Sequence, residues 1–528
     1  MKKVLLACLV FVLSGNVLKA QTTKNDYSEA RQNLKKAMSI LDNTMNKYYN
    51  KSRHRLAMHY NFTTNQPEGV VSVWEYTSAI EAHNSVMEGL VALKEIEPQL
   101  YETHFNRYQQ QLEEIIDGLE YYAGSFKLTS YTGTNEWKGV YGVHRAAVKG
   151  FAKVADKENV YDDQMWIIRE LIRSYKLTQN QRYLDKAEFL TAYVLDGWDC
   201  NLDGQGDEYG GITWGPGYTS RHACSNSPLI SPLVWLSELY VGKDDTQTYY
   251  VLDKAGKRVQ KTQKKQAYYL EFAKKIYDWQ KRMLYVPEKG ACWDAVWADS
   301  GDIIYREKDG VKYRVHLDAY KKGGTFFTYN IGTMISGLAD LYRATQDATY
   351  KTDLDQMVPA SFRFFAPPVS FQGKHYNIYP VEGTKNLNGG AGSPWFNDVL
   401  LRGYIDASAY NGVAKRATKA AQTGLDYGYE HHLKGGIPPI DLFNGWKSEE
   451  KLNVMYALAR ASDYGMLVRY SYVTTGIDEV RAQKKSPDVS KVYDLTGRQV
   501  NAHTSATVAL TGLKPGVYIV DGQKRLIK

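Results

Sequence analysis

The chain has 528 residues, of which 43% are apolar and 23% are charged, so its composition is that of a globular protein and excludes a disordered chain. Its formal net charge of +8 is concentrated in the first 20 residues and in residues 476–528, where nine Lys/Arg face five Asp/Glu. The body is therefore close to neutral, and we expect no nucleic-acid partner. The spacing of cysteines and histidines fits no zinc motif, and we expect neither a metal nor a cofactor.

Residues 1–20 predict a secretory signal peptide. Lys2 and Lys3 precede an apolar stretch of about a dozen residues, and a small residue, Ala20, stands at the expected cleavage position. We therefore expect a protein that is secreted or held at the cell surface or in the periplasm. No later run reaches the ~20 apolar residues of a spanning helix, so we expect no transmembrane segment.

From Tyr27 to about Tyr470, apolar residues recur at spacings of three and four, which indicates amphipathic helices. Short polar breaks, such as 178–180, predict that neighbouring helices form antiparallel hairpins. Helices are expected to begin near Tyr27, Tyr76, Gln99, Trp137, Asp163, Gln181, Ser227, Lys264, Tyr329, Thr349, Pro394, Tyr410 and Ser448.

About a dozen helices over residues 21–473, with no linker inside, favour an all-α domain built as an (α/α)6 barrel, a toroid of six helical hairpins. A helical solenoid is the alternative, but solenoids repeat at a fixed period and the sequence shows none. Residues 249–262 and 303–315 interrupt the helical pattern, the second with the turn dipeptide Asp309-Gly310, and predict β-hairpins. These hairpins either border a cleft or are surface decoration.

The composition changes after residue 473. Residues 474–488 predict a polar linker, and residues 489–528 alternate apolar and polar positions between glycine turns, as in a small β module. At this size the module is marginal as an independent fold.

Asp162 and Asp163 are consecutive carboxylates at the start of a predicted helix. Glycoside hydrolysis commonly needs one ionised and one protonated carboxyl group, and two close carboxylates raise the pKa of one of them. Trp166, one turn further on, would supply an apolar surface that favours the protonated form. The alternative is structural, because Asp is frequent as an N-cap and in the first helical turn.

A glycine-rich loop follows. Gly210 and Gly211 would let a ligand approach the backbone, and Trp214 offers a face for stacking on a sugar. Asn226 precedes a helix, either as its cap or as an amide that binds sugar hydroxyls. Cys200 and Cys224 flank this loop and either form a disulfide or are free thiols.

Taken together, these segments resemble glycoside hydrolase family 76, the α-1,6-mannanases, over residues 30–470. The segments that carry the resemblance are Tyr161-Asp162-Asp163 with Trp166, Tyr183 to Ala187, Gly197-Trp198-Asp199, Gly210 to Trp214, Ala223 with Asn226, Thr328 to Gly332, Leu341-Tyr342 and Phe396 to Arg402. The resemblance implies an (α/α)6 barrel and a secreted, retaining endo-α-1,6-mannanase that acts on α-mannan or manno-oligosaccharides.

By motif, Asp162 would be the nucleophile and Asp163 the general acid/base. The substrate-binding residues would be Trp166, Gly210, Gly211, Trp214, Asn226, Tyr329, Asn330, Phe396 and Arg402. Two departures, Ile331 for Gln and Asn397-Asp398 for Lys-Gly, leave the linkage and subsite preference open. Other interpretations are a transglycosylase, lyase or epimerase on the same fold, a non-catalytic glycan-binding protein, and a structural solenoid.

The C-terminal module resembles the sorting tails of the type IX secretion, or Por, family. The matching segments are 492–498, 513–520 and the basic end 524–528. The resemblance implies export through that secretion machinery, whereas the alternative is a β appendage without an address.

Overall fold

The computed structural model describes residues 27–446 and 451–483, together with four strands between residues 490 and 527. The predicted signal peptide lies outside the described residues. By its internal contacts the chain divides into a unit of residues 29–472 and a second unit that contains residues 473–528.

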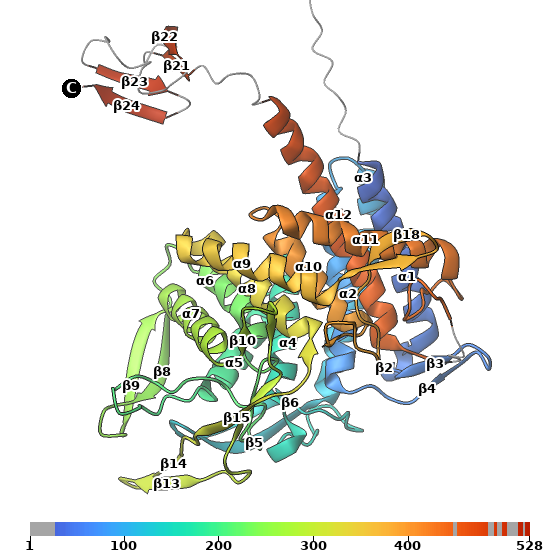
Figure 1. The fold of residues 1–528 in the computed structure, drawn as a ribbon. Helices are drawn as coiled ribbons and strands as arrows, with labels where there is room; N and C mark the ends of the chain where they lie inside the picture. Colours follow the sequence, from blue (N-terminus) through green and yellow to red (C-terminus); the bar gives the residue numbers. More distant parts are fainter. Residues whose placement is uncertain are drawn as a thin grey trace, which may run out of the picture. The chain divides into compact units, whose positions relative to one another are not determined.

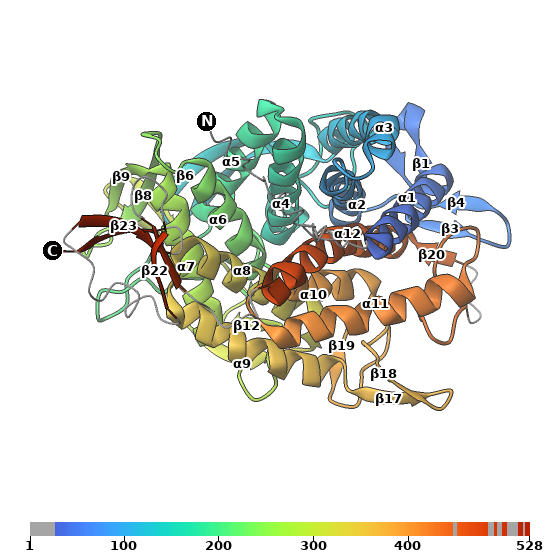
Figure 2. The same cartoon turned by 90° about the horizontal axis from the view of Figure 1, so that it is seen from above.

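The first unit is built from α-helices in two concentric layers (Figures 1 and 2). The outer helices are α1 (Ser28–Tyr48), α3 (Pro98–Gly118), α5 (Gln181–Asp196), α7 (Lys265–Met283), α9 (Ala348–Phe365) and α11 (Gly412–His432). The inner helices are α2 (Val73–Ala92), α4 (Tyr161–Thr178), α6 (Ile230–Leu239), α8 (Thr328–Thr345), α10 (Pro394–Ala407) and α12 (Val454–Gln483). This is the six-hairpin (α/α)6 toroid that the sequence predicts.

A helix-ending residue and a capping residue reverse the chain between an inner and an outer helix. Gln179 ends α4 in the left-handed conformation with φ of 57°, and the side chain of Asn180 caps α5. Gln346 and Asp347 repeat the arrangement between α8 and α9. The predicted break at 178–180 is thereby confirmed.

Helix α1 closes the ring between the last helices and the first hairpin. Asn33 donates a hydrogen bond to Ser471 of α12 at 3.4 Å, and Arg107 of α3 forms a two-pronged ion pair with Asp42. Because each hairpin returns the chain to the same end, the six inner helices run in parallel, and their N-termini gather at one end of the toroid.

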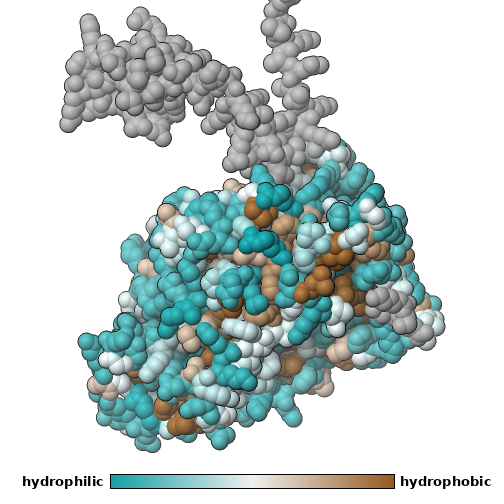
Figure 3. Space-filling view, viewed as in Figure 1, coloured by the Kyte–Doolittle hydropathy of each residue, from teal (hydrophilic) through white to brown (hydrophobic). Residues whose placement is uncertain are grey.

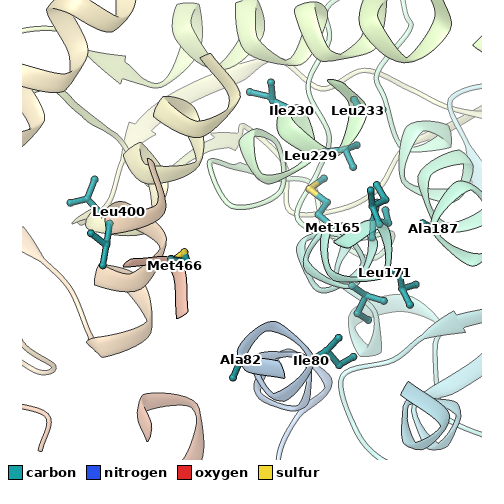
Figure 4. Packing of buried hydrophobic residues seen from close by; sticks show 14 of the residues in the cluster. Ile80, Ala82, Met165, Leu171, Ala187, Leu229, Ile230, Leu233, Leu400 and Met466 are labelled. Carbon is teal, nitrogen blue, oxygen red and sulfur yellow. The ribbon is translucent and has the colours of Figure 1, made fainter. Parts of the chain in front are cut away.

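The core lies mainly between the two helical layers. Figure 4 shows this packing with Ile80 and Ala82 of α2, Met165 and Leu171 of α4, and Leu400 of α10. Inner helices such as α2 are buried on nearly every side, whereas outer helices such as α3 bury only one stripe. The surface in Figure 3 is accordingly mostly polar, with hydrophobic residues in patches.

Several β-hairpins extend from the helical scaffold. The predicted hairpins are confirmed as β8 (Thr246–Leu252) with β9 (Arg258–Lys264), and β13 (Tyr305–Lys308) with β14 (Val311–Arg314). Asp309 and Gly310 both have positive φ, as the turn dipeptide predicts. The helix expected near Trp137 is wrong, since that residue lies in β6 (Gly133–Tyr141), paired with β5 (Ala123–Ser130). Thr, Trp, Val and Tyr are residue types that favour strands, and Gly133 and Gly139 disfavour a helix there.

The remaining strands of this unit are short. They are β1 (Tyr49–Asn50), β2 (Arg55–Leu56), β3 (His59–Asn61), β4 (Gln66–Glu68), β7 (Arg221–His222), β10 (Tyr285–Val286), β11 (Ala291–Cys292), β12 (Ala295–Ala298), β15 (Ala319–Gly323), β16 (Phe326–Phe327), β17 (Pro368–Phe371), β18 (Lys374–Asn377), β19 (Gly390–Ala391) and β20 (Lys451–Asn453).

The second unit contains a four-stranded antiparallel sheet, as the alternation in its sequence predicts. Its strands are β21 (Ser490–Tyr493), β22 (Gln499–His503), β23 (Gly516–Val520) and β24 (Gln523–Ile527), in the order β22-β21-β23-β24. Among the described residues of the whole chain, no helix combines the length and the apolar character needed to cross a membrane.

Candidate active site

Asp162 and Asp163 are the second and third residues of α4, at the end of the toroid where the inner helices begin. The N-cap is Val160, whose side chain accepts no capping bond, so neither aspartate is the cap. Asp163 is 5% exposed, and Asp162 is half-buried. The pair therefore lies at the positive end of a helix dipole, and neither aspartate has the structural role of capping the helix.

Burial raises the pKa of both carboxyl groups. For Asp162 the increase is partly offset by the Cys224 thiol, by the backbone N–H groups of Asp162 and Asp163, and by the Trp214 indole. For Asp163 the charges of Asp162 and Glu75 raise the pKa further, and it stands well above the ordinary value. The environment therefore favours a proton on Asp163 and the ionised form of Asp162.

No cation of the described residues neutralises this pair, because none of their ion pairs includes Asp162 or Asp163. The nearby His222 packs against Trp214 at 4.8 Å between ring centroids, and burial lowers its pKa to about 4, so it is neutral at pH 7. A carboxyl pair with elevated pKa values and no counter-ion is typical of a catalytic site.

Aromatic side chains from four inner helices surround the same end. Tyr329 stacks on Phe396 with ring centroids 4.2 Å apart, and Phe396 stacks on Trp74 at 6.1 Å. These three are partly buried, whereas Trp166 is 4% exposed and meets Trp395 edge to face at 4.9 Å. Trp74, Tyr329 and Phe396 thus present ring surface, while Trp166 supports them from beneath.

The glycine-rich loop serves internal packing, which corrects the prediction that it contacts the substrate. Gly210 and Gly211 have φ of 76° and 82°, and a Cβ at either position would overlap Trp198 or Trp279. The loop is held against α4 because Trp214 O accepts a 2.7 Å hydrogen bond from Tyr161 N. Of the predicted loop residues, half-buried Trp214 is the one that faces Asp162.

Asn226 is fully buried, and its amide clamps the same loop. Its Oδ1 accepts from Ile212 N at 2.9 Å, and its Nδ2 donates to Ile212 O at 3.0 Å and to His222 O at 2.8 Å. The side chain makes no helix-capping bond. Asn226 therefore occupies the N-cap position before Ser227 without capping through its side chain, and its burial contradicts the interpretation as a sugar-binding amide.

A third carboxylate, Asp294, completes the site and was missed in the sequence. Asn330, which is fully buried, donates to Asp294 Oδ1 at 3.2 Å, so it orients a neighbour instead of contacting substrate. Burial raises the pKa of Asp294. Asp162 and Asp294 each raise the pKa of Cys224 and of Tyr329, so the two carboxylates share neighbours at this end of the toroid.

Arg402 does not join this group. It is 3% exposed, two turns into α10, where it forms ion pairs with Glu81 and with Asp398, the latter at 3.1 Å. Ile331 and Asp398 are fully buried as well, so neither departure from the family pattern reaches an open subsite directly. Asn397 is tied to Thr328 Oγ1 and to Pro380 O.

The structure decides whether Cys200 and Cys224 form a disulfide or are free thiols. Cys200, Cys224 and Cys292 are all buried free thiols, so the proposed Cys200–Cys224 disulfide is absent. In the described part of the chain, no group of His, Cys, Asp or Glu side chains is arranged to hold a metal ion.

The sequence model of glycosyl hydrolase family 76 matches residues 250–410, a segment that includes Asp294, Tyr329 and Phe396 but not the aspartate pair. The search of curated proteins finds no match. A family 76 glycoside hydrolase from a bovine Bacteroides thetaiotaomicron strain superposes with a TM-score of 0.60 at 18% identity, covering 83% of this chain and 77% of that chain. The fold is that of family 76 glycoside hydrolases.

Two further solved structures support this assignment of the fold. The family 76 mannosidase Bt3792 of Bacteroides thetaiotaomicron VPI-5482 gives a TM-score of 0.59 at 18% identity and covers 83% of this chain and 98% of its own. The α-1,6-mannanase GH76A of Salegentibacter sp. HEL1_6 gives 0.53 at 20% identity, with coverage of 84% and 99%. An inactive variant of that mannanase, with two consecutive aspartates changed to asparagine, is known in complex with α-1,6-mannotriose.

Proposed function

We propose that this protein is a retaining endo-α-1,6-mannanase of the family 76 type, acting on α-mannan or manno-oligosaccharides. The observation that carries the proposal is the consecutive pair of half-buried Asp162 and buried Asp163, which have no ion-pair partner among the described residues and lie where the inner helices of an (α/α)6 toroid begin. The solved α-1,6-mannanase that is inactive without two consecutive aspartates supports it.

The environment of each aspartate suits a double displacement. Asp163 holds the proton and would transfer it to the glycosidic oxygen as the bond to the leaving sugar breaks. Asp162, whose carboxylate is stabilised by two backbone N–H groups, would attack the anomeric carbon and form a glycosyl-enzyme ester. Asp163, now ionised, would then take a proton from water, which displaces Asp162 and releases a product of retained configuration. Trp74, Tyr329 and Phe396 would border the sugar.

Secretion is part of the same proposal. It rests on the basic and apolar character of residues 1–20 and on the similarity of the tail to type IX sorting modules. Deletion of residues 489–528 should then retain the protein inside the cell envelope of a host with that machinery, while the full chain reaches the medium or the cell surface.

The decisive experiment incubates the full chain with debranched α-1,6-mannan and separates the products. We expect a ladder of manno-oligosaccharides, initially of α configuration by NMR, and no release after Asp162→Ala or Asp163→Ala in folded protein. Initial β products would disprove retention, and activity in either variant would disprove the role of that residue.

One rival has a specific observation in its favour. A D-mannose isomerase shares the fold, with a TM-score of 0.52 at 10% identity and coverage of 86% of this chain. Conversion of free mannose to another monosaccharide, with no cleavage of mannan, would favour that rival.

A further inference from the structure

A second cavity lies on the outside of the toroid, away from the aspartate pair. It measures about 360 Å³, which is within the ~300–1,000 Å³ typical of ligand pockets. Hairpins β5–β6 and β8–β9 and helices α5 and α7 form it. Its lining residues are Thr132, Asn135, Glu136, Trp137, Ala192, Leu195, Asp196, Trp198, Cys200, Glu208, Gln247, Thr248, Tyr249, Tyr250, Val251, Tyr268 and Phe272. This outer cavity shares no residue with the group around Asp162 and Asp163.

The outer cavity and the candidate active site are separated by the glycine-rich loop. Trp198 lines the outer cavity and also packs against Gly210, whose loop continues to Trp214 beside Asp162. The Trp198 indole is fixed by a 2.7 Å hydrogen bond to Glu208. One rigid side chain therefore forms part of the boundary between the two regions.

Rigid aromatic rings from both hairpins line the cavity. Tyr249 of β8 packs on Tyr268 at 4.8 Å and on Phe272 at 5.9 Å between centroids. Trp137 of β6 packs on Tyr193 at 5.2 Å and on Phe189 at 5.8 Å. Rings held in this way bind a ligand without losing rotational freedom, and their faces suit the C–H surface of a sugar.

Polar side chains accompany the rings in the same cavity. Asp196 accepts from Ser130 and Thr132, each at 2.9 Å, and from Asn135 at 3.3 Å. The Trp137 indole N–H lies beside the same carboxyl group and lowers its pKa. Carboxylate oxygens accept hydrogen bonds from hydroxyl groups, so Asp196 gives this cavity a polar contact for a sugar.

The charges of the cavity restrict the class of ligand. Glu136, Asp196 and Glu208 line it, and none of its lining residues is Lys or Arg. Glu208 is paired with Lys275 at 3.2 Å and Glu136 with Lys138 at 3.6 Å, whereas Asp196 has no ion-pair partner among the described residues. Asp196 therefore disfavours an anionic ligand, whereas sugar hydroxyls can donate to carboxylate and amide oxygens. The chemistry favours a neutral sugar.

We propose that the outer cavity is a second glycan-binding site, which holds one or two neutral sugar units of a polysaccharide outside the catalytic site. The identity of that polysaccharide as α-mannan rests on the proposed function, but the class of ligand follows from the cavity. By retaining the polymer on the surface, the site raises the local concentration of chain near Asp162 and Asp163.

The test compares polymer with a short substrate. Two variants change the cavity: Tyr249→Ala removes a ring, and Trp137→Phe keeps a ring but removes the indole N–H beside Asp196. Tyr305→Ala is the control, because it removes a tyrosine from a strand of a different hairpin, β13–β14, where the side chain is 40% exposed and does not line the outer cavity. Circular dichroism and thermal midpoints verify that every variant folds.

Binding is measured by retardation in gels that contain soluble α-1,6-mannan, with Asp162→Asn and Asp163→Asn added to stop turnover. We expect Tyr249→Ala to weaken binding about tenfold, Trp137→Phe to weaken it less, and the control to match the parent. In the catalytically competent background, hydrolysis of mannotetraose should stay within about twofold. Unchanged polymer binding in both folded cavity variants, or an equal loss on mannotetraose, would overturn the proposal.

Failure of the proposed function would be recognised separately, as an absence of mannan hydrolysis by the unmodified chain. The same gels are then run with a panel of other neutral polysaccharides. Retardation that depends on Tyr249 by any of them supports the outer site, and no such retardation by the whole panel overturns it.

Discussion

Two pairs of carboxyl groups in the described part of the toroid differ in their surroundings. Asp162 and Asp163 lie at the start of α4, whereas Asp398 and Asp463 face each other between α10 and α12. In both pairs burial is the main cause of elevated pKa values, and in each a neighbouring carboxylate raises one of them further. An elevated carboxyl pKa therefore does not by itself separate a catalytic pair from a structural pair.

The two pairs differ in their ion-pair partners and in the solvent exposure of their side chains. Asp398 and Asp463 are 0% and 1% exposed, and they are held by Arg402 at 3.1 Å and Arg460 at 3.2 Å. Asp162 has no ion-pair partner among the described residues, is half-buried, and lies beside partly exposed aromatic rings. A buried carboxylate that is paired with an arginine is not available to a substrate. A carboxylate without such a counter-ion can transfer protons or act as a nucleophile.

The strongest test of this contrast replaces one carboxyl group in each pair by its amide. We expect Asp163→Asn to reduce the rate on α-1,6-mannan by about 10³-fold or more, because the proton donor is lost. Asp398→Asn should retain near-native activity per folded molecule, because that side chain is sealed from the substrate. Initial rates, normalised to the folded fraction from circular dichroism, decide between them.

Comparable losses in both variants would abolish the distinction between the pairs. Asp463→Asn serves as a second test of the interior pair, in case Asp398→Asn folds poorly. Native-like activity in Asp463→Asn would locate the chemistry at Asp162 and Asp163.

Arg402 should matter for stability and not for substrate binding. Arg402→Met leaves Glu81 and Asp398 without their shared counter-ion, and losing one member of such a buried pair costs about 3–5 kcal/mol of unfolding free energy. Arg469→Met is the control, since its ion pairs span 3.7 and 3.9 Å, its side chain is 53% exposed, and its contribution should be about 0–1 kcal/mol. Denaturant titration measures both.

If Arg402 instead had the substrate-binding role that the family pattern implies, its replacement would weaken substrate binding and leave stability unchanged. In that case Arg402→Met would raise KM several-fold while leaving the denaturation midpoint unchanged.

Local patterns account for most of the fold that could be predicted from the sequence. The helical period, the break at 178–180 and the Asp309-Gly310 turn each specify structure through neighbouring residues, and each is confirmed. The segment around Trp137 was misassigned because apolar spacing over a few residues fits both a helix and a strand, and β-branched neighbours decided for the strand.

The candidate site was only partly visible, for a related reason. Asp162 and Asp163 are adjacent in the sequence, so their coupling could be inferred. Trp74, Glu75 and Asp294 reach them only through closure of the ring, which no local pattern encodes. Sequence motifs also do not say which way a side chain points, so Asn226 and Arg402 were misassigned.

The smallest expected effect concerns the pH dependence of the Asp162–Asp163 pair. The charge of Glu75 raises the pKa of Asp163, so Glu75→Gln should lower it. Glutamine preserves the capping box that Glu75 forms with Ser72 at the start of α2, so the fold should persist. Because the general acid is active only while protonated, the alkaline limb of kcat/KM should move to lower pH.

The acidic limb provides an internal reference. Asp162 must be ionised to attack, and its elevated pKa places that limb above the ordinary range of aspartate. Glu75 is not among the main influences on Asp162, so we expect this limb to move less than the alkaline one. In Asp398→Asn both limbs should coincide with those of the unmodified chain. An alkaline limb that stays in place in Glu75→Gln would show that burial and Asp162 alone hold the proton on Asp163.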